Sequence, residues 1–372
     1  MIDVREVANK RELKAFVKFP FGLYKDSKYW VPPIIKDELE TFNKDKNPAF
    51  LDADATFFLA YKDGKIVGRI AAIVNWIEVK EQKLSKMRFG WFDMIDDLEV
   101  SGALLEKVAE IGKSHKLEYM EGPVGFSNLD KVGVLTEGFD HIGTMITWYN
   151  HPYYEKHYIH HGLVKEKEYL ENKFPFENVK PEFFERVQGL IKKRYQLREL
   201  NFTKTKDIMP YVDQMFDLFN ESYASLSSFV PINDIQKAYF KERYLNFINP
   251  EFIKFVIDKD NKLVAFAIVM PSFSEALQKM NGKLFPFGIF HLLKARKKPK
   301  NITFYLIGVH PEYQNKGLTA IIFMEYYLTF TEKNIQNCIR TPELIENTAI
   351  HQIWKHFKPV THKRRKTYKK NL

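Results

Sequence analysis

Short runs of β-branched and aromatic residues alternate along the chain with longer segments in which apolar residues recur every three or four positions. The short runs predict strands and the longer segments predict amphipathic helices. In the first half, the pattern predicts strands at 2–7, 55–61, 65–74, 89–95 and 117–120, and helices at 9–23, 101–116 and 153–161. In the second half, it predicts strands at 197–202, 252–257, 263–270, 302–307 and 337–340, and helices at 207–223, 318–331 and 347–357.

The two halves share one order of elements, and their first strands begin about 195 residues apart. Such a fixed spacing indicates an internal duplication. Interspersed strands and helices predict α/β domains, each with a mixed sheet. We therefore expect two domains, at 1–170 and 197–372, joined by a helical connector at 171–196. The stretch 271–300 is an insertion, interpreted as a helical brace, with an active-site lid as the alternative.

A polar turn with a glycine joins the strand at 302–307 to the helix at 318–331. Backbone N–H groups at the start of a helix point to one place and, with the helix dipole, favour an anion there. Gly317 allows a ligand to approach the backbone closely, because it has no Cβ. This turn is the strongest candidate for a binding site in the chain.

The order strand, Val309-x-Pro311, Gln314-x-x-Gly317-x-Thr319, helix resembles the acyl-CoA site of the GNAT superfamily of N-acetyltransferases. Thr319 departs from the small residue that is usual in the family. The resemblance implies two tandem GNAT-like domains and acetyl-CoA, or another acyl-CoA, as co-substrate. It also implies acyl transfer to a primary amine of a small molecule or peptide. Motif detail extends from about Phe304 to Phe357.

The resemblance also implies roles for individual residues. The acyl-CoA ligands would be Ile307, Gly308, Val309, Gln314, Asn315, Lys316, Gly317, Leu318, Thr319, Asn347 and Trp354. A backbone N–H near Ile307–Val309 would polarise the thioester carbonyl.

The general acid and base depart from the family's pattern. Trp354 stands where the family often has a tyrosine as general acid, and an indole N–H is too weak an acid for that role. Tyr305 is the substitute that we expect, with Tyr223 or water as alternatives, and Glu221 is the candidate base.

The first half lacks this anion-binding turn. After its strand at 89–95 come Asp96, Asp97 and Glu99, and these carboxylates would repel a pyrophosphate. Acyl-CoA is therefore predicted in the second domain only.

Other residue patterns predict neither a metal site nor a membrane span. The single cysteine, Cys338, excludes an intramolecular disulfide and a cysteine-rich metal site. The histidines at 151, 157, 160 and 161 lack a metal-binding pattern and are interpreted as an interfacial or solvated face. No secretory signal or spanning apolar run is visible, so a cytoplasmic location is expected.

The net charge of +10 is concentrated in two runs, 294–300 and the C-terminal 361–372, which hold five and six Lys or Arg residues. We interpret the C-terminal run mainly as a solvated terminus. Two alternative functions stay open. One is an aminoacyl transferase of the Fem type. The other is a non-catalytic binding module whose basic tail binds nucleic acid.

Overall fold

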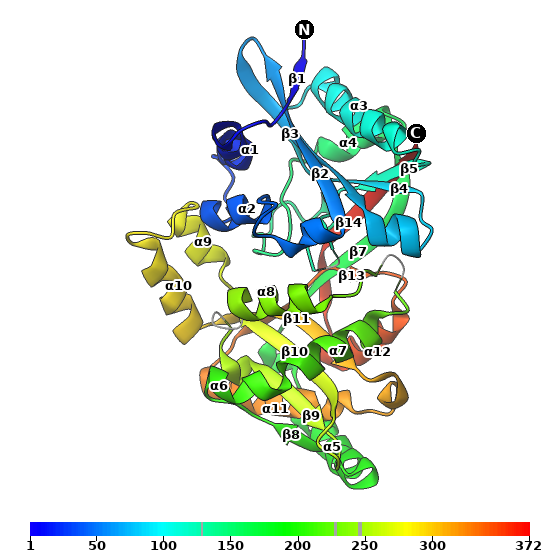
Figure 1. The fold of residues 1–372 in the computed structure, drawn as a ribbon. Coiled ribbons are helices and arrows are strands. Elements are labelled where there is room, and N and C mark those ends of the chain that lie inside the picture. Colours follow the sequence, from blue (N-terminus) through cyan, green and yellow to red (C-terminus); the bar gives the residue numbers. More distant parts are fainter. Residues whose placement is uncertain (128, 227–228, 245–247) are drawn as a thin grey trace. The chain divides into compact units, whose positions relative to one another are not determined.

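The protein divides into two compact units in a computed structural model, which describes residues 1–127, 129–226, 229–244 and 248–372 (Figure 1). Unit 1 comprises Met1–Leu170, Phe273–Leu292 and His362–Leu372. Unit 2 comprises Glu171–Ser272 and Leu293–Thr361. Each unit contains its own part of the sheet and its own helices.

Unit 1 has strands in the order β1-β2-β3-β4-β5-β14, all antiparallel to their neighbours except the parallel pair β4–β5. The strands are β1 (Asp3–Glu6), β2 (Ala53–Lys62), β3 (Lys65–Asn75), β4 (Lys86–Met94), β5 (Tyr119–Gly122), β6 (Val134–Glu137) and β14 (Val360–Asn371). The helices are α1 (Lys10–Leu23), α2 (Ile35–Thr41), α3 (Leu98–Ser114), α4 (Tyr154–His160) and α9 (Ser274–Met280), with α10 (Gly288–Lys297) beginning in this unit.

Unit 2 has strands in the order β8-β9-β10-β11-β12-β7, with β11–β12 as the parallel pair. The strands are β7 (Val164–Pro175), which begins in unit 1, β8 (Arg198–Leu200), β9 (Ile253–Ile257), β10 (Leu263–Pro271), β11 (Asn301–Val309), β12 (Asn337–Arg340) and β13 (Glu343–Leu344). The helices are α5 (Pro181–Tyr195), α6 (Thr205–Ile208), α7 (Val212–Tyr223), α8 (Asp234–Tyr244), α11 (Thr319–Lys333) and α12 (Thr348–Trp354).

The two units repeat one strand order, and the last strand of each sheet comes from the other half of the sequence. In unit 2, β7 pairs with β12 through Lys173–Pro175. In unit 1, β14 pairs with β5 through Tyr368–Asn371. The expected boundaries therefore differ from the compact units: 362–372 and 273–292 group with unit 1, and the connector 171–196 groups with unit 2.

The C-terminal basic run is a strand, so its interpretation as a solvated terminus is wrong. Lys363 and Arg365 are buried, and the Arg365 guanidinium donates to the carbonyl of Trp148 at 2.6 Å. Partly exposed basic residues of β14 pair with carboxylates of unit 1: Arg364 with Glu137 and Glu168, Lys366 with Glu155, and Lys369 with Glu166. The sequence pattern of β14 predicts an exposed segment, because the carboxylates that neutralise its charges come near it only in the folded protein.

Local sequence explains the remaining elements well. The Asp63-Gly64 turn has φ of 51° and 76°, which is the left-handed pair that a two-residue hairpin needs. The apolar stripe of α3 buries Val100, Leu104 and Val108 against unit 1's sheet. No helix in the described ranges is long and apolar enough to cross a membrane.

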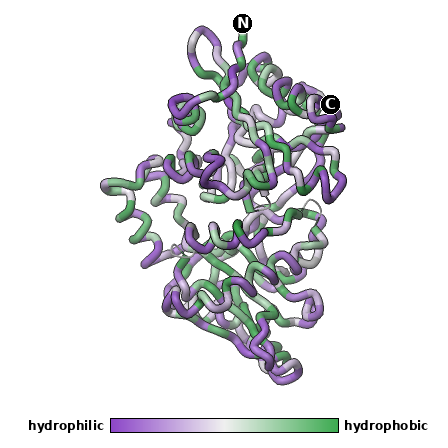
Figure 2. Tube along the Cα trace, in the orientation of Figure 1, coloured by the Kyte–Doolittle hydropathy of each residue, from purple (hydrophilic) through white to green (hydrophobic). Residues whose placement is uncertain are grey.

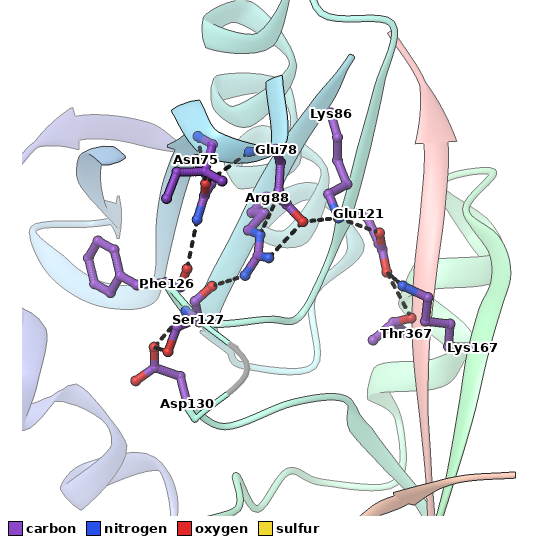
Figure 3. Close-up of polar contacts among 12 residues, drawn as sticks. Asn75, Glu78, Lys86, Arg88, Glu121, Phe126, Ser127, Asp130, Lys167 and Thr367 are labelled. Carbon is purple, nitrogen blue, oxygen red and sulfur yellow. Dashed lines mark hydrogen bonds and ion pairs between the residues drawn. The ribbon is translucent and has the colours of Figure 1, made fainter. Parts of the chain in front are cut away.

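A buried cluster of charges in unit 1 joins β4 to β5 and to the helical turn Ile77–Glu81, which precedes β4 (Figure 3). Arg88 and Lys86 both pair with Glu78, at 2.6 and 2.7 Å, and Lys86 also pairs with Glu121 at 3.2 Å. Burial by itself would raise the pKa of Glu78, but the two cations outweigh it and lower the pKa to about 2. The carboxylate therefore stays ionised in the folded protein.

We predict that Glu78→Gln strongly destabilises the protein. Removing one partner of a buried ion pair typically costs about 3–5 kcal/mol, because the other charge remains buried and unpaired. The folded pKa of Glu78 lies below its unfolded value. The difference between wild type and variant should therefore be largest above about pH 4.5 and shrink as the pH falls toward about 2. Urea unfolding at several pH values measures this.

Glu110→Gln is the control for that experiment. Its ion pair with Lys107 is exposed, so the variant should lose no more than about 1 kcal/mol. Equal losses for both variants would show that the cluster does not stabilise unit 1.

Two neighbouring arginines test the role of β14. Arg365→Met removes buried bonds to backbone carbonyls and should destabilise the protein by about 2–4 kcal/mol. Arg364→Met removes partly exposed ion pairs and should cost about 1 kcal/mol or less. Denaturant unfolding of both variants gives the comparison, and a larger loss for Arg364→Met would contradict the strand's burial pattern.

Candidate functional site

The central feature of unit 2 is the point where β11 and β12 part. β12 pairs with β11 only through Asn301–Phe304, whereas β11 continues to Val309 beside β10. The register between β10 and β11 shifts around Tyr305, which marks a β-bulge. Among the described residues, no strand pairs with Leu306–Val309 on the edge that β12 leaves.

The backbone at the end of β11 alternates between its two edges. The N–H of His310 donates to the carbonyl of Val264 at 2.9 Å, on the β10 side. By the antiparallel alternation, the backbone groups of Ile307 and Val309 point to the open edge. Their carbonyls already accept side-chain bonds: Ile307 from Tyr223 Oη at 3.0 Å, and Val309 from Ser222 Oγ at 3.1 Å and Gln314 Nε2 at 3.2 Å. The N–H groups of Ile307 and Val309 therefore remain directed to the open edge.

The turn after β11 occupies 310–318 and leads into α11. Gly317 has φ of +78° and Asn315 has φ of +59°, both in the left-handed region. A Cβ at Gly317 would meet Val187 of α5 at 3.4 Å, so the conformation and not crowding requires glycine there. The ammonium of Lys316 lies over the rings of Tyr195 and Tyr313, 5.5 and 5.8 Å from their centroids.

The start of α11 is open to an anion. No side chain caps this helix, and its first turn contains no acidic residue. The first amide groups of a helix have no acceptor within the helix, so they can bind an external acceptor. A pyrophosphate is an acceptor of this kind.

Unit 1 offers the opposite arrangement at the equivalent place. Only Ile95–Asp97 separates β4 from α3, the Asp97 side chain accepts from the N–H of Glu99, and a second acid follows in the first turn. On β4, the Phe89 carbonyl accepts from the N–H of Val124 at 2.8 Å, and the Met94 backbone bonds the hydroxyls of Tyr153 and Tyr154, so the edge that β5 leaves is covered. At this place unit 1 has neither an open strand edge nor an anion-binding turn in its described residues.

The residues of α12 lie near the first half of β11. Asn347 accepts a bond from the N–H of Ile350 at 3.2 Å, as expected of an N-cap. Trp354 is buried among aromatic rings, with its ring centroid 4.7 Å from that of Phe304, and the Arg340 guanidinium lies 4.7 Å over the indole. The indole Nε1 is buried and has no hydrogen-bond partner in the part of the chain that the structure describes. An unpaired buried N–H beside the parted strands is compatible with a ligand atom there.

Of the expected acid and base residues, the fold places Glu221 at the end of β11. Its Oε2 lies 3.4 Å from Nε2 of His310, the residue that follows the strand. The sequence pattern places His310 only in the turn and does not predict this pair, because α7 and β11 are distant along the chain. Tyr305 lies at the bulge and is half buried.

Tyr223 is already engaged as a donor. Burial raises the pKa of Tyr223 to about 12, and its hydroxyl donates to the carbonyl of Ile307. It therefore positions the end of β11 and is a poor source of protons.

The histidines of unit 1 form a second polar cluster, for which we expect an interfacial or a solvated face, and for His157 the solvated alternative is wrong. Its ring is buried, with Nε2 2.9 Å from Asp96 Oδ1 and Nδ1 2.9 Å from Ser101 Oγ. Ser101 also bonds His161 and the carbonyl of Leu98. Because Ser101 is fully buried and its hydroxyl is surrounded by three partners, the cluster ties α3 to α4 and offers no accessible nucleophile.

Comparison with known proteins identifies the fold. No family model matches the chain. The chain is 28% identical to Protein YghO of Escherichia coli (strain K12) over 326 residues, covering 86% of this chain and 81% of that protein. It is 24% identical to the Bacterial ceramide synthase of Caulobacter vibrioides (strain NA1000 / CB15N) over 319 residues, covering 84% and 82%.

A solved structure of a tandem GNAT protein from the clavulanic acid biosynthesis pathway aligns with 100% of this chain and 98% of its own, with a TM-score of 0.59 and 9% identity. At that identity the likeness concerns the fold. The duplicated strand order of the two units agrees with it. The chain therefore has a tandem GNAT-like α/β fold, as its sequence predicts.

Proposed function

We propose that the protein is an N-acyltransferase that moves an acyl group from acyl-CoA to a primary amine, with acyl-CoA bound by unit 2. One observation carries the proposal: a strand whose edge is open is followed, after the turn 310–318, by the uncapped and acid-free start of a helix. The first feature suits a pyrophosphate and the second suits an extended arm with amide groups.

The residues of the turn would hold the pyrophosphate. Their donors would be the amides of Gly317 and Leu318, just before α11, and of Thr319, its first residue, with Asn315 and Lys316 preceding them in the turn. Gln314 fixes the turn to the strand through the Val309 carbonyl. The pantetheine arm would pair with Leu306–Val309, with Asn347 and Trp354 on the α12 side.

The transfer needs a base for the amine and a donor for the thioester oxygen. The amine nitrogen attacks the thioester carbon, the carbon–sulfur bond breaks, and CoA leaves as the thiolate. Glu221 would accept the amine proton, held in place by His310, and Tyr305 would return a proton to the sulfur. The N–H groups of Ile307 and Val309 would stabilise the negative charge on the thioester oxygen.

Acetyl is the leading acyl group, from the turn's resemblance to acetyl-CoA sites. The relative named a ceramide synthase favours including long-chain acyl-CoA and long-chain amino alcohols in the screen of donors and acceptors, beside small-molecule and peptide amines.

An aminoacyl donor of the Fem type remains an alternative. The alternative of a nucleic-acid-binding tail loses its support, because the basic run is β14 with acidic partners. A cytoplasmic location stays a prediction.

Gly317→Asp and Gly317→Asn test where acyl-CoA binds. Both side chains tolerate a left-handed backbone and have nearly the same size, so the pair isolates the added negative charge. We expect Gly317→Asp to bind acetyl-CoA at least about tenfold more weakly than Gly317→Asn, a difference of about 1.4 kcal/mol. Isothermal titration calorimetry gives both affinities.

Gly189→Asp, on the exposed side of α5, is the control and should bind as the wild type does. Equal affinities of the Asp and Asn variants would place the pyrophosphate elsewhere. Absence of binding by folded wild-type protein to any acyl-CoA would refute the proposed function.

Glu221→Gln tests the base. General bases typically contribute about 10²–10⁴-fold to the rate, so the variant's kcat should be lower than that of wild type by a factor of this order. The affinity for acyl-CoA should stay unchanged, because Glu221 contacts His310 and not the turn's amides. Glu312→Gln, exposed in the same turn region, should leave kcat unchanged. A steady-state assay that detects free CoA thiol measures both variants, and an unchanged kcat for Glu221→Gln would exclude it as the base.

A further inference from the structure

An exposed apolar patch lies between α9 and α10 and along the first turns of α10. Phe285, Phe287 and Phe290 are 71%, 73% and 65% exposed, and Leu293 is 49% exposed. Apolar side chains gathered on a surface mark a place of interaction, whereas single exposed ones are ordinary. Four large apolar side chains within nine residues form such a gathering.

The patch is organised by the periodicity of α10. Gly288 and Leu292 face the interior, so Phe290 and Leu293 point outward. Further along the same helix, Lys294 and Lys297 are exposed, each four positions after Phe290 and Leu293 respectively. Figure 2 shows the segment change from hydrophobic to hydrophilic toward its C-terminal end. The helix therefore has an apolar beginning and a basic end on its outward side.

The charge around the patch has one sign only. From 276 to 311 the sequence has no Asp or Glu and has seven Lys or Arg residues, at 279, 283, 294, 296, 297, 298 and 300. Lys294, Lys297 and Lys298 are exposed, and no ion pair joins any of them to another residue that the structure describes. The basic groups remain available to an external anion.

We propose that the segment 283–298 is a peripheral membrane-binding surface for bilayers that contain anionic lipid. Exposed aromatic rings insert at the boundary between headgroups and acyl chains, and adjacent lysines contact lipid phosphates. The two kinds of residue are separated along the segment, which suits a bilayer whose apolar and anionic layers are also separate. The inference is independent of the proposed acyl transfer.

Two other occupants fit the surface less well. In a symmetric contact with a second copy, the basic runs of both copies would lie close together without acidic partners. Single-stranded nucleic acid favours aromatic rings that alternate with basic groups along a groove, whereas here the rings precede the basic run. Both are outcomes that the experiment distinguishes.

The test is flotation of the full-length protein with vesicles of phosphatidylcholine alone or with phosphatidylglycerol added. Wild type should float with the anionic vesicles and less so in high salt. The triple variant Phe285→Ser/Phe287→Ser/Phe290→Ser should lose binding, whereas Ile159→Ser/Leu190→Ser, at exposed apolar positions elsewhere, should retain it. Lys294→Gln/Lys297→Gln/Lys298→Gln should weaken binding at least about tenfold, since each lysine contributes about fivefold near an anionic surface.

A fluorescent label reports insertion directly. The chain's cysteine, Cys338, is buried, so Phe285→Cys provides the accessible thiol for an environment-sensitive dye. Its emission should shift to the blue with anionic vesicles, and the same dye on Ile159→Cys should not respond.

The proposal is overturned by any of three results. The first is wild type that stays unbound while circular dichroism shows an intact fold. The second is a phenylalanine variant that binds vesicles as well as wild type does. The third is loss of self-association in sedimentation, or of binding to a single-stranded oligonucleotide, in the patch variants while no vesicle binding is seen; the patch would then serve that other partner.

Discussion

The parting of β11 from β12 is the constraint on which the candidate site depends. β12 runs beside β11 for four residues and then leaves, so the end of β11 keeps one edge of backbone groups unpaired by any described strand. Unpaired backbone in a fold is costly unless water or a ligand satisfies it. Side chains of α7 and of the turn satisfy the carbonyls of Ile307 and Val309, and this leaves their N–H groups for a ligand.

The two units show how one fold can keep or lose a binding site. In unit 2 the turn 310–318 is long, contains residues of positive φ and opens onto an uncapped helix. In unit 1 the connection is short, Asp97 caps the helix, and the N–H of Val124 pairs with the carbonyl of Phe89 on the strand's edge. Nearby, buried ion pairs join Arg88 and Lys86 of β4 to Glu78, and Lys86 also to Glu121 of β5 (Figure 3). The same strand order thus supports binding chemistry in one unit and buried ion pairs in the other.

The exchange of last strands makes the C-terminus part of unit 1's sheet. Thr367 of β14 bonds Glu121 of β5 across 246 positions of sequence. Basic side chains are well suited to this strand because unit 1 supplies Glu137, Glu155, Glu166 and Glu168 along it. The excess positive charge of the terminus is therefore a pairing pattern and not a free tail.

The sequence by itself determined the elements whose signals are local. The duplicated order, the hairpin at Asp63-Gly64, the strand at 337–340 and the turn at Gly317 all follow from short-range periodicity and from the backbone conformations that glycine allows. Tertiary structure decided whatever depends on partners far away in sequence. It made β14 a strand, buried His157 between Asp96 and Ser101, and brought His310 to Glu221. The sequence pattern predicts that these polar residues are exposed to solvent, because their hydrogen-bonding and charged partners come near them only on folding.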